Sequence, residues 1–271
     1  MQTVCLTYDF DAVAAWLAME MPGYYSWGEF GAETAVPRLL AFHERHGLPS
    51  TWFVPGHTIE SFPEASAAID DAGHEIQHHG WSHEPLPSFD SRAAERHDFE
   101  RGFDAIYDLT GTKPNGFRNP AGGFSEHTAE LLEEFGFEWD SSEGVRDLEP
   151  YYLRDEPTLT PGEPYEPGRR TGIVEIPLLW YRDDWLQLFP VVSGPEFVSY
   201  GYETQLFDRW RAELEWARSH RDDGVVVLLL HPQCAGRAPF MAEFEAFVEE
   251  LTEQDDVRFR DVSTVAAEFD G

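Results

Sequence analysis

The segment Val225-Val226-Val227-Leu228-Leu229-Leu230, followed directly by His231-Pro232, decides the fold class of this chain. It is the most tightly apolar stretch of the sequence, and its length is typical of a strand. A histidine at the end of a buried strand usually faces a functional site in an α/β protein. We therefore expect a buried strand at Val225–Leu230 with a reactive side chain at its carboxyl end.

Strand-like and helix-like segments alternate along the rest of the chain. Strands are expected at Val4–Tyr8, Ser50–Val54, His74–His78, Gly116–Arg118, Phe137–Asp140 and Ile173–Leu179. Helices are expected at Glu33–His46, Pro63–Ala72, Arg92–Leu109, Glu126–Phe135, Glu203–Ser219 and Pro239–Gln254, with Val257–Asp261 and Ser263–Phe269 completing the series. This alternation predicts an α/β barrel or an open doubly wound sheet.

The domain organisation is predicted to be simple. The 271 residues, 42% of them hydrophobic, are enough for one large domain or two small ones. The sequence has no linker that would divide it, so residues 1–271 are expected to form one domain. The segment Leu148–Arg170, rich in Pro, Glu and Tyr, looks like a long excursion from the alternating pattern.

The net charge of −32 restricts the partners and the surroundings. It arises from 51 acidic against 19 basic residues, and Lys113 is the single lysine. Such a surface repels nucleic acid and anionic membranes, so neither is an expected partner. An acid-rich, lysine-poor composition resembles that of cytosolic proteins in halophiles that accumulate salt. The sequence has no apolar run of membrane-spanning length and no basic amino-terminal region, which predicts a cytoplasmic protein in a high-salt cytosol.

Polar residues follow several of the expected strands, where an α/β barrel carries its site. Asp9 and Asp11 follow the first strand, and two carboxylates so spaced can point into one cavity with different roles. His79 and His83 stand four residues apart, so that one helical turn or a tight loop would direct both imidazoles to one point. Together with one carboxylate they would make a three-ligand site for a divalent metal. Arg118 follows its own short strand as His231 follows Val225–Leu230.

Taken in order, these segments resemble the NodB-homology polysaccharide deacetylases, in particular the peptidoglycan-deacetylase-like and allantoinase-like branch. The shared motifs are an Asp pair, His-x₃-His, Arg-x-Pro and a strand followed by His-Pro, which fall on Asp9 and Asp11, His79 and His83, Arg118 and Pro120, and His231-Pro232. A fifth motif, which stands fourth in chain order, matches either Trp139–Ser142 or Trp180–Trp185. The resemblance spans roughly residues 3–265. It implies a distorted (β/α) barrel of the NodB type with fewer than eight regular strands.

The resemblance also implies roles for these residues. Asp11, His79 and His83 would hold one divalent metal ion, most often zinc in this family, which activates a water molecule. Asp9 would be the general base, and His231 would protonate the departing nitrogen.

Other residues would assist this reaction. Arg118 would hold Asp9 through a charge-assisted pair. Either Asp140 or Asp184 would orient His231 or contact the substrate, and the sequence leaves that choice open. Residues expected to contact the substrate are Pro120, Trp180, Trp185 and Tyr25.

The leading functional hypothesis is a metal-dependent hydrolase of non-peptide amide bonds that removes the acetyl group from an N-acetylated amino sugar. Ring opening of a small cyclic amide, an imide or a ureide, is the alternative. A catalytically inactive, metal-stabilised binding protein and a non-haem iron oxygenase are more remote alternatives, since two histidines and a carboxylate also serve such oxygenases. The sequence leaves the native metal and homo-oligomer formation open.

Overall fold

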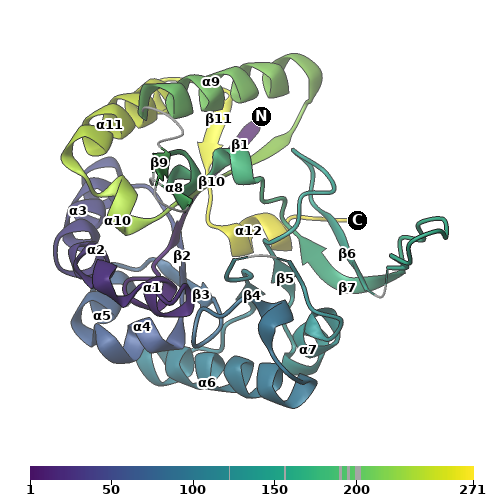
Figure 1. The fold of residues 1–271 in the computed structure, drawn as a ribbon. Coiled ribbons are helices and arrows are strands. Elements are labelled where there is room, and N and C mark those ends of the chain that lie inside the picture. The colour runs from purple at the N-terminus through teal and green to yellow at the C-terminus, as the bar shows by residue number, and fades with distance from the viewer. Residues whose placement is uncertain (122, 156, 189–190, 194–195, 199–202) are drawn as a thin grey trace.

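The structure, a computed structural model, describes residues 1–121, 123–155, 157–188, 191–193, 196–198 and 203–271. Its main sheet curls into a barrel-like ring surrounded by helices (Figure 1). The strands are β1 (Gln2–Asp9), β2 (Thr51–Val54), β3 (Glu75–His78), β4 (Gly116–Phe117), β5 (Trp139–Asp140), β6 (Tyr151–Asp155), β7 (Arg169–Glu175), β8 (Val191–Ser193), β9 (Glu196–Val198), β10 (Gly224–Leu230) and β11 (Val257–Phe259).

The inner wall of the ring is parallel along the path β10-β1-β2-β3-β4-β5-β7. Strand β6 pairs antiparallel with β7 at the edge, and β11 pairs with the first residues of β1. β1 and β10 are apolar in sequence because both lie in the centre of the molecule, where helices cover one face and the barrel interior the other.

Among the described residues, no regular strand closes the ring between β7 and β10. At that position a single parallel bridge joins Asp183 to Leu229, so an irregular segment fills the gap. This is the distorted (β/α) barrel that the family resemblance implies, although the main sheet, over the residues that the structure describes, has nine strands and not fewer than eight, because β6 and β11 join it beside the parallel path.

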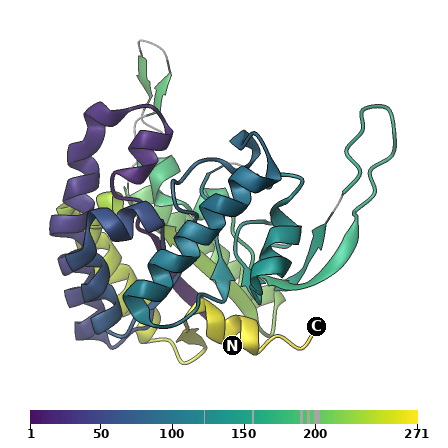
Figure 2. The same cartoon turned by 90° about the horizontal axis from the view of Figure 1, so that it is seen from below.

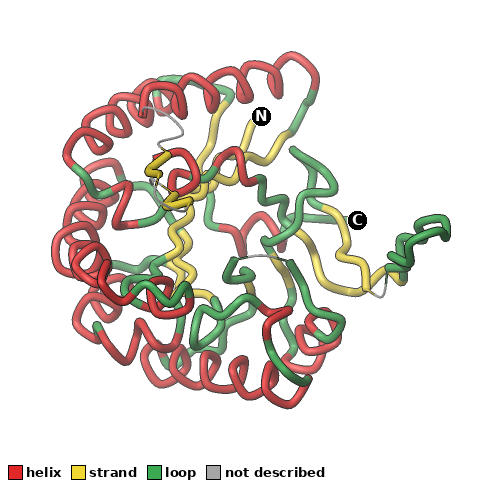
Figure 3. Tube along the Cα trace, in the orientation of Figure 1, coloured by secondary structure: helices red, strands yellow, loops and turns green. Residues whose placement is uncertain are grey.

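Helices surround the sheet, and most of them form an outer layer, shown as red coils around the yellow strands (Figure 3). They are α1 (Ala14–Ala18), α2 (Tyr25–Phe30), α3 (Val36–His46), α4 (Gly56–Ser61), α5 (Pro63–Asp71), α6 (Arg92–Thr110), α7 (Thr128–Phe135), α8 (Asp184–Leu188), α9 (Glu203–His220), α10 (Pro232–Ala235), α11 (Ala238–Thr252) and α12 (Val262–Ala267). Shorter turns are the 3₁₀-helices η1 (Pro22–Tyr24), η3 (Leu86–Ser88) and η4 (Trp180–Arg182) and the π-helix η2 (Gly31–Ala35). No helix in the described part of the chain combines the length and hydropathy of a membrane span.

Helix α12 differs from the others because it lies in the middle of the ring (Figure 1). Its residues Val262 and Val265 pack with Cys5, Phe53 and Val227 in one buried cluster. It follows β11, which pairs with the start of β1, so it covers the amino-terminal end of the barrel. The carboxyl ends of the strands are thereby left as the end at which a site can open.

The excursion expected at Leu148–Arg170 has a more regular structure than the sequence suggests. It contains all of β6 and the first residues of β7, and the connection between them extends away from the barrel as an arm (Figure 2). The strand expected at Ile173–Leu179 is shifted toward the amino terminus, since β7 runs from Arg169 to Glu175. The helix expected from Glu126 begins at Thr128, and Ser125 accepts a hydrogen bond from the main-chain N of His127 in the preceding turn.

Candidate active site

The polar residues singled out in the sequence gather at the carboxyl ends of the parallel strands. Asp9 ends β1, His79 directly follows β3, Arg118 follows β4 and His231 follows β10. Because neighbouring parallel strands end at the same edge of a sheet, residues far apart in the sequence meet there.

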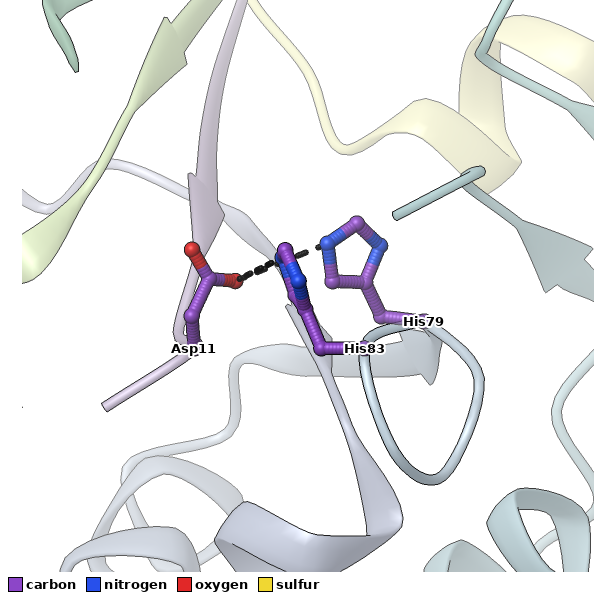
Figure 4. Close-up of side chains that lie close together, drawn as sticks. All are labelled: Asp11, His79 and His83. Atoms are coloured by element: carbon purple, nitrogen blue, oxygen red, sulfur yellow. Dashed lines mark ion pairs between the residues drawn. The ribbon is translucent and has the colours of Figure 1, made fainter. Parts of the chain in front are cut away.

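Asp11, His79 and His83 lie close together at this end of the barrel (Figure 4). Oδ1 of Asp11 is 3.5 Å from Nε2 of His79 and 3.4 Å from Nε2 of His83. All three side chains are buried. Nδ1 of His79 donates to the carbonyl oxygen of Arg118 at 2.9 Å. The lone pair of the other ring nitrogen, Nε2, therefore remains free and faces Asp11.

These three residues fit a divalent metal ion. Oδ1 of Asp11 is buried and has no hydrogen-bond partner among the described residues, although two imidazole nitrogens lie nearby. Burial would raise the pKa of Asp11, but the nearby imidazoles of His83 and His79 hold it below its usual range. The carboxylate is therefore an anionic donor, and two imidazoles and one carboxylate form a common set of zinc ligands with open positions. The pKa of His83 is raised because Asp11 outweighs the effect of burial, so protons compete with a metal for His83.

The two histidines come from a tight loop and not from a helix. Gly80 (φ +68°) and His83 (φ +61°) both adopt left-handed backbone conformations, which cost more for a histidine than for a glycine. Asp98 of α6 secures the turn: its carboxylate accepts from the main-chain N of Trp81 and Ser82, at 2.8 and 2.9 Å. A Cβ on Gly102 would lie 2.6 Å from the carbonyl oxygen of Gly80, so a glycine is required where α6 approaches the loop.

Arg118 joins several strand ends beneath the site. Its side chain is fully buried, and its Nη1 donates to Oδ1 of Asp9 at 2.7 Å and to Oγ1 of Thr7 at 2.9 Å. Its Nε and Nη2 donate to the carbonyl oxygen and the hydroxyl of Ser141, at 3.0 and 3.1 Å, and the guanidinium lies over the ring of Phe53. These contacts fix Asp9, whose Oδ2 lies 3.8 Å from Nε2 of His79.

His231 is held by two neighbouring carboxylates. Its Nδ1 donates to Oδ1 of Asp184 at 2.8 Å, and Oδ1 of Asp183 lies 3.5 Å from the same atom. Its Nε2 lies 3.7 Å from Oδ2 of Asp11. Burial opposes the charged imidazolium, but Asp183 and Asp184 raise the pKa of His231 to about 10. The pKa of Asp183 itself is raised to about 7, because its burial and the charge of Asp184 outweigh the attraction of His231.

Of the two acids considered as the partner of His231, the structure brings Asp184 to it. Asp140 is fully buried at the end of β5, and no hydrogen bond or ion pair links it to His231 among the described residues. It accepts from the hydroxyl of Ser142 at 2.8 Å and lies beside Glu175 of β7. Asp140 is thus removed from the cavity.

A cavity of about 300 Å³ opens over these groups. The residues that line it are Asp9, Asp11, Ala15, Ala18, Met19, His79, His83, Pro85, Asn119, Ala121, Ser142, Leu178, Trp180, Asp183, Trp185, Leu186, Leu229 and His231. Polar groups therefore form its floor, while much of its wall is apolar. The ring of Trp185 lies 5.3 Å from that of His231, whereas Trp180 is 59% exposed at the rim.

The two remaining residues expected to contact a substrate are absent from the described lining of this cavity. Tyr25 begins α2 and is 56% exposed. Pro120 is buried beneath the His79–His83 loop, where a Cβ on Gly80 would lie 3.5 Å from its ring. Its neighbours Asn119 and Ala121 line the cavity instead.

Some residues of the site were not anticipated from the sequence. Asp183 is adjacent to Asp184 within a segment already considered, so its acidic side chain was the available signal. Ser141 and Ser142, which bind Arg118 and the main-chain N of Asn119, directly follow Asp140, and that position was the available signal for them. Asp98 lies in the middle of α6 in a strongly acidic chain, and the sequence offers no signal that separates it from the solvated acids around it.

Comparisons with known proteins agree with this site. The polysaccharide deacetylase family model matches residues 3–139. A peptidoglycan deacetylase of Helicobacter pylori is 32% identical over 96% of this chain and 94% of its own. A peptidoglycan deacetylase-like protein of Gibberella zeae is 31% identical over 92% of this chain and 80% of its own.

Solved structures share the fold over nearly the whole chain. A Mycobacterium smegmatis protein assigned to the polysaccharide deacetylases superposes with a TM-score of 0.83 at 34% identity, over 98% of this chain and 89% of its own. Puue allantoinase superposes with a TM-score of 0.78 at 21% identity, over the same shares, which concerns the fold alone. The family match and the full-length relatives show that this chain belongs to the polysaccharide deacetylases, hydrolases of amide C–N bonds.

Proposed function

We propose that the protein is a metal-dependent N-deacetylase of an N-acetylated amino sugar. The observation that carries this proposal is the arrangement of three groups around one cavity: a His-His-Asp cluster, the Asp9 carboxylate held by Arg118, and the His231 imidazole held by Asp184. Amide hydrolysis by water needs an electrophile, a base and an acid, and these groups supply one of each.

Asp11, His79 and His83 would hold the metal ion, with Zn²⁺ favoured by their donor atoms. When bound, such an ion polarises an amide carbonyl and lowers the pKa of a water molecule. Asp9 would take the proton from the attacking water, because its Oδ2 faces the cluster while its Oδ1 is held by Arg118. The neighbouring guanidinium keeps the carboxylate fixed for that transfer.

His231 would give a proton to the nitrogen that leaves. Its Nδ1 is occupied by Asp184, so Nε2 is the atom that can deliver the proton. The pKa of His231, raised to about 10, keeps it protonated at neutral pH, as a general acid must be before it acts.

The size of the cavity limits the substrate. About 300 Å³ is the lower end of the range for small-molecule sites and accommodates one sugar ring or one small heterocycle. The largely apolar wall, with Leu178, Trp185 and Leu186, also suits the flat face of a cyclic amide. Ring opening of an imide or ureide is therefore the second candidate function, carried by the cavity's size and wall.

The experiment is a direct comparison of the two substrate classes. Protein freed of metal and reloaded with Zn²⁺ is assayed in molar KCl for acetate release from N-acetylglucosamine and chitooligosaccharides. Parallel assays follow the ring opening of cyclic imides and ureides. Acetate release that disappears in Asp9→Asn supports the deacetylase. If the protein turns over only the cyclic amides, ring opening replaces deacetylation as the proposed function. If no metal form turns over either substrate class, both proposed functions are contradicted.

A further inference from the structure

Two fully buried carboxyl groups lie side by side behind the site. Asp140 at the end of β5 and Glu175 at the end of β7 are partners in the parallel register of these strands. Side chains at paired positions of neighbouring strands project to the same face of a sheet, so the two carboxyls are held close together. None of the roles assigned above uses Glu175.

Each of these carboxyls has one oxygen satisfied and one not. Oδ1 of Asp140 accepts from the hydroxyl of Ser142, and Oε1 of Glu175 accepts from the main-chain N of Ser142 and of Glu143, at 3.0 and 2.9 Å. Oδ2 of Asp140 and Oε2 of Glu175 are buried without a donor among the described residues. Two adjacent buried carboxylates would repel each other, but one proton between them turns two unsatisfied acceptors into a hydrogen bond.

We propose that Asp140 and Glu175 share one proton and that this hydrogen bond positions the Ser141–Ser142 turn, which in turn positions the catalytic base. Ser141 receives two of the hydrogen bonds of Arg118, and the hydroxyl of Ser142 accepts from the main-chain N of Asn119 at 2.8 Å. Arg118 then holds Asp9. Glu175 is thus a positioning residue, and its effect on turnover rests on the proposed function.

The electrostatics of the pair agree with a retained proton. Burial, followed by the charge of Asp140, raises the pKa of Glu175 well above its usual range, and burial raises that of Asp140 to about 6. The charged and titratable groups that face the pair are Arg118, which favours one negative charge on it, Glu143 and Tyr151. Glu143 and Tyr151 are neutral or anionic groups, so neither supplies a positive charge that could replace the proton, and burial raises the pKa of both.

Infrared difference spectroscopy tests the shared proton directly. Near about pH 8 exposed carboxyls are ionised, so a protonated carboxyl gives a separate carbonyl band. Glu175→Gln keeps the shape and adds an amide donor for Asp140, and it should remove this band. Glu138→Gln, at an exposed acid just before β5, is the matched control and should leave the band unchanged. The same band in wild type and Glu175→Gln would overturn the shared proton.

The dependence of stability on pH is a second test that needs no substrate. A carboxyl whose pKa is raised in the folded state stabilises the fold fully below its unfolded value, and this contribution is lost as pH rises through the folded value. Glu175→Gln lacks this titrating carboxyl. Its melting temperature should therefore rise relative to that of wild type as the pH increases from about 5 to about 8. A difference that stays constant over that range contradicts the shared proton.

Turnover tests the positioning role. Glu175→Ala should lower kcat at least about tenfold with unchanged metal content and little change in KM, since the base and not the ligands is displaced. Glu175→Gln should recover most of that loss, which general destabilisation by a buried amide would not do. Equal kcat in wild type and Glu175→Ala overturns the positioning role. If wild type turns over neither substrate class, the proposed function fails while the infrared and stability results still decide the shared proton.

Discussion

The carboxylate of Asp184 holds both the side chain and the backbone of His231. One carboxylate accepts from Nδ1 of the imidazole at 2.8 Å and from the main-chain N of the same residue at 3.0 and 3.1 Å. The imidazole is therefore fixed in rotation as well as in tautomer, with Nε2 toward the cavity.

Asp184→Asn should lower kcat by about two to three orders of magnitude, because an amide neither stabilises the imidazolium nor enforces the tautomer. Steady-state kinetics with metal-loaded protein check this. Asp183→Asn is the matched control, since Asp183 lies 3.5 Å from Nδ1 of His231, and it should cost less. Equal losses in the two variants would show that Asp184 has no special role.

Asp9→Asn should retain the metal but reduce kcat by about two to four orders of magnitude, the range for loss of a general base. An asparagine can still accept from Arg118, so the fold should persist. Metal analysis and kcat are measured on the same preparation. Near wild-type kcat would mean that Asp9 is purely structural.

His83→Ala should lose most of the bound divalent ion, because two remaining donors compete poorly with water. Elemental analysis after dialysis against a weak chelator gives the number of ions per chain, expected to be about one for wild type. His97→Ala, an exposed histidine of α6, should retain the ion. Equal metal in His83→Ala and wild type would exclude His83 as a ligand.

His43 makes stability depend on pH far from the site. It is buried, accepts from the hydroxyl of Tyr8 and donates to the carbonyl oxygen of Leu48. Burial, together with the neighbouring His74, lowers its pKa to about 3. A histidine with a lowered folded pKa contributes stability above its unfolded value near about 6.5, and this is lost as pH falls toward 3.

Wild type should therefore lose more unfolding free energy between about pH 7.5 and pH 5 than His43→Gln does, by up to about 2 kcal/mol. Denaturant unfolding curves at the two pH values give both differences. Parallel losses in the two proteins would mean that His43 takes up no proton on unfolding.

The net charge of −32 predicts a gain of stability with salt. Arginines pair with acids on the surface, as Arg92 does with Glu130 and Glu134, but 51 acids greatly outnumber 19 basic residues. At about 1 M salt the Debye length is about 3 Å, so most of the net repulsion is screened. The melting temperature should rise between about 0.2 M and 2 M KCl, and more than in an uncharged osmolyte matched on a neutral protein. A flat or falling curve contradicts a high-salt cytosol.

The parts of this structure that follow from local pattern could be predicted. Helix α3 ends before Gly47, and β10 coincides with an apolar run. Both features could be predicted because a glycine and an apolar run determine the backbone structure within a few residues of themselves. The cluster of Asp11, His79 and His83 was expected from motif order. Of the two conformations that the His-x₃-His spacing allowed, a helical turn or a tight loop, the structure has the tight loop.

What could not be predicted depends on tertiary contact. Whether Asp140 or Asp184 contacts His231 depends on where the segment after β7 lies. The bridge from Asp183 to Leu229 places this segment beside the end of β10, and so brings Asp184 to His231. Asp98 and Glu175 are buried acids that accept hydrogen bonds from main-chain N–H groups, and such a main-chain contact leaves no trace in the sequence.

Strand β1, which leads into Asp11, also has a consequence for biosynthesis. All three candidate metal ligands lie within the first 83 residues, yet β1 pairs along Gln2–Tyr8 with Gly224–Leu230 of β10. A ribosome that has made the ligands must still make about 150 further residues before β1 gains this neighbour. Such distant pairing closes a long loop and slows folding, so the strand that leads into Asp11 stays without this neighbour until β10 has been made.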